Sequence, residues 1–230
     1  MNMNGKSFLP IDGTPWEAPI PAPIPRAGWL LASLFLLPAL LATIPRMDEP
    51  LVLLVATSLA LPACIAPAKA LGLRHISGRD LLSVAVFYLL WIAISLPLTA
   101  GWEILLKVCH IGYAPQQHLS DVITGSTRWY ARAALFWSVC INTPIVEEVL
   151  FRRMIYAGCR RVCPVAAAAA ASAAVFALVH FFILGIPSLF VMGILLQGVF
   201  LRRNNLWCAI ILHSLINVLS FSILLTKEFI

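Results

Sequence analysis

The chain has 230 residues, of which 61% are hydrophobic and 11% charged, with a mean hydropathy of +0.92 and a formal net charge of +6. Soluble domains carry about 25% charged residues and cannot hide this much apolar surface, which excludes a water-soluble globule. The basic residues stand in short clusters between apolar runs, so we expect no nucleic acid partner. The composition predicts an integral membrane protein in contact with the lipid bilayer.

The N-terminal 26 residues form a predicted flexible, proline-rich tail. They lack the apolar core and cleavage site of a signal peptide. Residues 27–230 are then expected to form a single transmembrane helical domain, with the catalytic motifs in 131–221. Six of the prolines of the chain lie in the tail: Pro10, Pro15, Pro19, Pro21, Pro23 and Pro25.

Seven apolar runs follow the tail, and a membrane-spanning helix needs roughly 20 such residues. Helices satisfy their own backbone hydrogen bonds in lipid, so the fold class predicted is all-α, a polytopic bundle of seven to eight helices. The eighth is a partial span, which Pro97 would separate within the third run. The runs are 28–44, 51–68, 81–106, 131–158, 165–186, 188–201 and 206–225.

The distribution of Lys and Arg predicts the orientation of these spans. A cytoplasmic N-terminus puts eleven basic residues on the inner side and leaves five outside, namely Arg46, Lys107, Arg128, Arg132 and Lys227. We therefore expect a cytoplasmic N-terminus and an external C-terminus. The compact, alanine-rich chain suggests a bacterial source, and hence the bacterial inner membrane.

Two adjacent carboxylates, Glu147 and Glu148, lie inside the run 131–158. A charged residue costs about 2.5 to 3.5 kcal/mol at the centre of a membrane helix, so each needs a reason to be there. Glu148 and Arg152 are four residues apart in the order that favours an ion pair, whereas Glu147 lies about 100° away around the helix. An unpaired buried carboxylate suits a general base. Pro144 should kink the helix one turn before the acids. The alternative is a helix end whose charges face the cytoplasmic interface.

Two further polar groups lie in later apolar runs. Phe176 and His180 form a Phe-x-x-x-His pattern, and His213 and Asn217 are four residues apart on one helix face. If the chain turns near residues 163–164, Glu147 and His180 both lie about 20 to 25 Å from that turn and can meet. Taken alone, each of these groups would more often make an interhelical hydrogen bond than carry catalysis.

Together the three patterns resemble the motifs of the CPBP family, the CAAX proteases and bacteriocin-processing enzymes, also called the Abi family. The likeness covers about 131–221, and Pro144 and the stretch 205–212 fit it. It implies an intramembrane endopeptidase that uses a glutamate-activated water and no cofactor. The implied catalytic residues are Glu147 as base, His180 holding the water, His213 and Asn217 as oxyanion donors, and Glu148 with Arg152 as a brace.

Two alternatives remain open at this point. Two glutamates and two histidines could also hold zinc, which would make the chain an intramembrane metalloprotease. The same bundle could instead be a non-catalytic immunity or scaffold protein. The expected partner is a membrane-associated protein or peptide substrate, and the sequence does not select among lipidated tails, leader peptides and C-terminal sorting segments. It also leaves the oligomeric state open.

The orientation is testable by cysteine labelling with a membrane-impermeant reagent. The reagent applied from outside should modify a cysteine introduced at Gln116, because the loop after the third span is predicted to be external. It should miss one introduced at Gly78, in a basic cluster predicted to be cytoplasmic. The reverse labelling pattern would show that the orientation is wrong.

Overall fold

The computed structural model describes residues 49–64, 71–113 and 128–226. Within these ranges the regular structure is entirely helical, as predicted. Four helices are long and apolar enough to cross a bilayer, and two apolar helices are shorter. Seven to eight spans are therefore not confirmed, and the first predicted span, 28–44, lies outside the described residues.

The four candidate spans are unequal in burial as well as in length. The shorter apolar helices are α3 (Glu49–Ala60), which continues into the 3-10 turn η2 (Leu61–Cys64), and α10 (Val165–Leu178). The second long helix, Trp129–Cys159, has the largest buried share of the four and contains both acids. The long helices are α5 (Gly78–Val108), Trp129–Cys159, α11 (Ile186–Arg203) with the preceding 3-10 turn η5 (Ile183–Gly185), and α12 (Leu206–Thr226).

Trp129–Cys159 changes its helical geometry along its length. Two π-helical stretches, in which the backbone bonds reach five residues back, alternate with α-helix. Its segments are α7 (Trp129–Trp137), the π-helix η3 (Ser138–Asn142), α8 (Thr143–Glu148), the π-helix η4 (Val149–Ile155) and α9 (Tyr156–Cys159). The two acids therefore occupy the last two positions of a short α segment between two wide ones.

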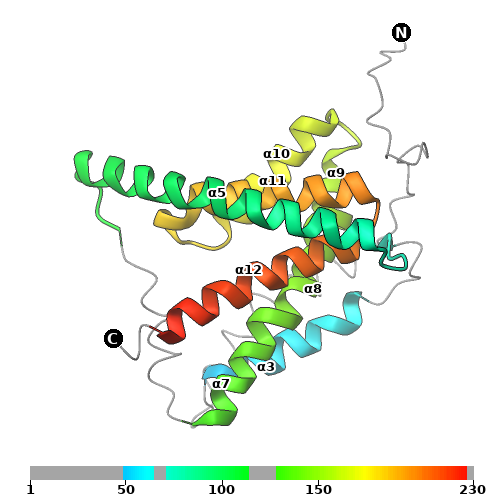
Figure 1. Ribbon diagram of the computed structural model, residues 1–230, viewed down its shortest axis with the longest axis horizontal. Coiled ribbons are helices and arrows are strands. Elements are labelled where there is room, and N and C mark those ends of the chain that lie inside the picture. Colours follow the sequence, from blue (N-terminus) through cyan, green and yellow to red (C-terminus); the bar gives the residue numbers. More distant parts are fainter. Residues whose placement is uncertain (1–48, 65–70, 114–127, 227–230) are drawn as a thin grey trace.

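α5 runs antiparallel to α11, and polar contacts join them at both ends (Figure 1). At one end Trp102 Nε1 donates to the carbonyl oxygen of Ile183 at 3.0 Å. At the other, Arg203 Nε lies 2.6 Å from Asp80 Oδ1. Figure 1 shows α12 beneath this pair and α3 beside the start of Trp129–Cys159 at the opposite side.

Pro97 does not divide the third predicted span. It lies inside α5, which is one helix of 31 residues, so the expected partial eighth span is wrong here. A proline removes one N–H bond and bends a helix, but an apolar helix with neighbours can continue through it.

α10 ends earlier than the apolar run 165–186 predicts. The helix stops at Leu178, and Phe181 has a φ of 49°. This left-handed conformation is incompatible with a continuing right-handed helix. Because every side chain from 175 to 184 except His180 is apolar, hydropathy alone gives no sign of this break. His180 consequently lies in the connection after α10 and not within a span.

α10 and α11 approach each other closely at a glycine. A Cβ atom at Gly193 would lie 2.9 Å from both the Cα and the Cβ of Ala173, so only glycine fits at this crossing. Small residues are the usual means of close helix contact in membranes. The contact fixes α10, and with it the side chains at its C-terminal end.

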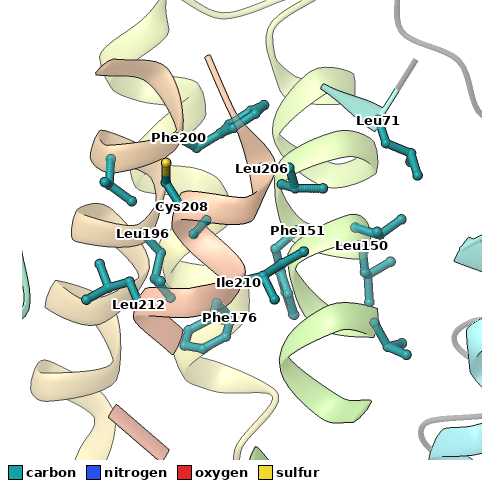
Figure 2. Close-up of a cluster of buried hydrophobic side chains, with 14 of the residues drawn as sticks. Leu71, Leu150, Phe151, Phe176, Leu196, Phe200, Leu206, Cys208, Ile210 and Leu212 are labelled. Atoms are coloured by element: carbon teal, nitrogen blue, oxygen red, sulfur yellow. The ribbon is translucent and has the colours of Figure 1, made fainter. Parts of the chain in front are cut away.

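The main hydrophobic core lies where η4, α10, α11 and α12 meet. Figure 2 shows the side chains that fill it. The rings of Phe151 and Phe176 meet edge to face with centroids 5.0 Å apart. Because both rings are fully enclosed, this core positions η4 against α10 directly beside the acidic residues. Its labelled members are Leu71, Leu150, Phe151, Phe176, Leu196, Phe200, Leu206, Cys208, Ile210 and Leu212.

Candidate active site

The backbone around the acids is shaped by Pro144. Proline has no N–H to donate into the helix, and the neighbouring N–H of Thr143 bonds to Ser138 O, five residues back. The wide turn η3 thus stands where the sequence predicts a kink. π-turns add a residue to the helix and change which face the following side chains occupy.

Asn142 anchors this wide turn to α3. Its Nδ2 donates to Ser58 Oγ at 3.1 Å and to Thr57 Oγ1 at 3.3 Å. Asn142 is itself buried, so the amide would be costly without these partners. α3 therefore fixes the segment that precedes the acids.

Glu148 and Arg152 form a fully buried ion pair. Arg152 Nε lies 2.7 Å from Glu148 Oε2, and both side chains have 0% exposure. The guanidinium also lies over the ring of Phe176, 5.6 Å from its centroid. The ion pair predicted from the spacing of four residues is confirmed.

His213 of α12 lies between the two acids. Its Nδ1 is 3.0 Å from Glu148 Oε1, and its Nε2 is 3.8 Å from Glu147 Oε2. An ionised Glu148 can only accept, so Nδ1 carries the proton in this contact. Glu148 thus orients the imidazole, and the second ring nitrogen is directed at Glu147.

Glu147 differs from its neighbour in its partners. Its Oε2 is buried and has no hydrogen-bond partner among the described residues. The distance of 3.8 Å to His213 Nε2 exceeds a direct hydrogen bond but can be bridged by a water molecule. The two adjacent acids therefore have different environments. Both oxygens of Glu148 are paired, whereas Oε2 of Glu147 has no hydrogen bond among the described residues.

Phe176 contacts both His180 and His213 and so links His180 to the residues around the acids. His180 Nδ1 lies 2.6 Å from the carbonyl oxygen of Phe176, and the two rings have centroids 4.8 Å apart. The same Phe176 ring meets His213 edge to face at 5.8 Å. In the described part of the chain His180 has neither a hydrogen bond nor an ion pair with Glu147. Its expected role of holding the water stays a prediction.

Asn217 is occupied by the backbone of the wide turn. Its Nδ2 donates to Val139 O at 2.8 Å, a carbonyl within η3. The family resemblance implies Asn217 as an oxyanion donor beside His213, and that role stays a prediction. Asn217 does link α12 to the helix that bears the acids.

Two residues that shape the site, Ser172 and Arg153, belong to none of the three motifs. Ser172 Oγ donates to Phe151 O at 3.0 Å, and it is the one hydroxyl in the alanine-rich α10. Arg153 is buried with its guanidinium 5.7 Å from the ring centroid of Phe200. A serine in an alanine run and a second adjacent arginine were the available signals for these contacts.

The described residues contain no group of three or more His, Cys, Asp or Glu side chains arranged to hold a metal ion. Within the motifs, two of the four ring nitrogens already contact protein oxygens, His213 Nδ1 at Glu148 and His180 Nδ1 at Phe176. Only the Nε2 atoms of His180 and His213 are therefore left to bind a further ligand.

Residues 129–219 match the family model described as type II CAAX prenyl endopeptidase Rce1-like. No curated protein and no solved structure matches the chain significantly. The matched segment begins with α7 and ends within α12, so it contains every motif residue described above. The CPBP resemblance drawn from the motifs is confirmed for this segment, and the family is one of proteases.

Loss of Arg152 should destabilise the protein strongly. Arg152→Ala leaves Glu148 as an uncompensated buried charge, at a cost of about 3 to 5 kcal/mol. Thermal unfolding in detergent should show this as a large drop in midpoint and in the amount of folded protein. The matched control is Arg161→Ala, because Arg161 is exposed and should change stability by less than about 0.5 kcal/mol. Equal stability of the two variants would contradict the assignment of the ion pair.

Proposed function

We propose that this chain, an integral membrane protein with a CPBP-family segment at 129–219, is an intramembrane endopeptidase. It hydrolyses a peptide bond near a membrane-associated part of a protein substrate. The reaction uses a water molecule activated by Glu147. The observation that carries this proposal is the buried Oε2 of Glu147, which has no hydrogen-bond partner among the described residues and stands beside a fully paired acid.

A general base must be within hydrogen-bond reach of the proton it removes, directly or through one water. The gap of 3.8 Å between Glu147 Oε2 and His213 Nε2 suits a water that contacts both. In the first step this water attacks the carbonyl carbon of the scissile bond, and its proton passes to Glu147. The carbonyl oxygen becomes the oxyanion of a tetrahedral intermediate.

His213 enters this step as an imidazolium, with one proton on Nδ1 held by Glu148 and one on Nε2. Nε2 therefore donates to the oxyanion without taking a proton from the attacking water. A preorganised donor of this kind contributes about 3 to 4 kcal/mol to acyl transfer. Breakdown of the intermediate breaks the C–N bond, and Glu147 returns its proton to the leaving amine. His180 assists by positioning the water or relaying its proton from the Phe176 side.

Glu148 and Arg152 act on the reaction only through His213. The attraction between two opposite charges is stronger where water is excluded. The buried pair of Glu148 and Arg152 is therefore a rigid support for the imidazole of His213. The pair also keeps Glu148 unavailable as a base. This division explains why two adjacent glutamates are needed, since one carboxylate cannot be both a fixed anchor and a proton acceptor.

The description of the matching family model points to substrates with a CAAX tail. The resemblance of the motifs to the CPBP family also implies leader peptides or C-terminal sorting segments. A bacterial inner-membrane location with a cytoplasmic N-terminus is part of the proposal and would disfavour prenylated tails. The substrate is identified most directly by comparing membrane proteomes with and without the protein. New termini should then lie next to hydrophobic segments.

Glu147→Gln should abolish cleavage while leaving the fold intact. The amide preserves the shape of the side chain but cannot take a proton, so we expect a loss of at least about 100-fold in rate. The measurement is the appearance of new substrate termini in membranes that contain equal amounts of the variant and the unchanged protein.

The matched control for Glu147→Gln is Glu103→Gln, the same chemical change at a half-exposed acid on α5 that pairs with Lys107. It should retain cleavage. Near-normal cleavage by Glu147→Gln would show that another group is the base. Loss of cleavage in both variants would indicate that the membrane preparation is inactive. The measurement would then be repeated with purified protein in liposomes.

Metal dependence separates this reading from a zinc protease. We expect no stoichiometric zinc in the purified protein and unchanged activity after prolonged chelation and removal of the chelator. His213→Asn should retain part of the activity if His213 donates to an oxyanion, whereas loss of a ligand from a three-ligand zinc site is close to fatal. Stoichiometric zinc together with activity that chelation removes and zinc restores would favour the metalloprotease.

A further inference from the structure

A second polar site lies far along the bundle from the acids, where α5 and α12 begin and α11 ends. A pocket of about 210 Å³ opens there. Four arginines line it with one acid, Asp80, so cationic groups outnumber anionic ones even with His75 neutral. The lining includes Arg74, His75, Ser77, Arg79, Arg202 and Arg203.

The pocket is held in shape by buried polar contacts. Asp80 accepts from Arg203 Nε at 2.6 Å, and from Ser77 Oγ at 2.7 Å and Ser77 N at 2.9 Å. Asn205, 1% exposed, accepts from Arg74 N at 3.2 Å and donates to Arg74 O at 3.3 Å. The loop before α5 is thereby fixed to the connection between α11 and α12.

Two arginines of the lining, Arg79 and Arg202, are exposed at its rim. Arg203 instead pairs with Asp80, the one acid among the described lining residues. α5 and α12 also begin at this end, so the positive ends of their helix dipoles favour an anion, although Asp80 N and Leu206 N already bond to Ser77 and Gly72. Arginine binds phosphate oxygens with two parallel N–H groups, so the chemistry of the lining fits a phosphate group.

The position of the pocket indicates the source of the phosphate. α5, α11 and α12 belong to helices that are long and apolar enough to cross a bilayer, and the pocket lies where α5 and α12 begin and α11 ends. Lipid phosphates gather at that depth of a bilayer, and basic pockets between membrane helices bind anionic head groups. We propose that this pocket binds the phosphate group of an anionic phospholipid and so fixes α5 relative to α11 and α12.

The test compares lipid binding by the full chain and two double variants purified in neutral detergent. Arg79→Gln/Arg202→Gln removes the two rim arginines and leaves the pair of Asp80 and Arg203. The control, Arg128→Gln/Arg161→Gln, removes the same charge at exposed positions outside the pocket. Native mass spectrometry would measure retained phosphatidylglycerol, with phosphatidylcholine as the comparison lipid.

We expect the unchanged protein and the control to retain phosphatidylglycerol at least tenfold more tightly than phosphatidylcholine. The rim variant should lose this preference, and Arg79→Lys/Arg202→Lys should keep part of it. Equal retention by rim and control variants would overturn the proposal, because it would indicate general attraction to a basic surface. Millimolar inorganic phosphate binding in place of lipid would overturn the assignment to a lipid and leave a site for free phosphate.

Discussion

The buried pair of Glu148 and Arg152 is the interaction on which the candidate site depends. Two charges with no exposed surface are stable in an apolar helix bundle only together, and removing either leaves the other at great cost. Their separation of four residues on one helix brings the pair together without any other chain segment. His213 then attaches to Glu148, which joins α12 to the helix that bears the acids.

The π-turn that precedes the acids also helps to position them. The π-turn η3 accommodates Pro144 and is held from two sides, by Asn142 to α3 and by Asn217 of α12 to Val139. Both contacts tie the start of α8 to neighbouring helices. The orientation of Glu147 and Glu148 is therefore set by a segment with little freedom, as a preorganised site requires.

The sequence predicts those features that depend on composition and on spacing within one helix. Hydropathy alone shows that the chain belongs in a membrane, and the order of Glu148 and Arg152 predicts their ion pair. The end of α10 at Leu178 could not be predicted, because it rests on the left-handed backbone of Phe181 within a uniformly apolar run. The π-turns and the contact of Asn217 with Val139 depend on tertiary packing, which spacing along one helix does not contain.

In the proposed mechanism Glu147 Oε2 binds a water molecule, whereas both carboxylate oxygens of Glu148 bind protein groups. An experimental density map at a resolution that orders water tests it most directly. The expected result is a water within about 2.6 to 3.2 Å of Glu147 Oε2 that also contacts His213 Nε2. A metal ion at that position, or a direct ion pair between Glu147 and an arginine, would contradict it.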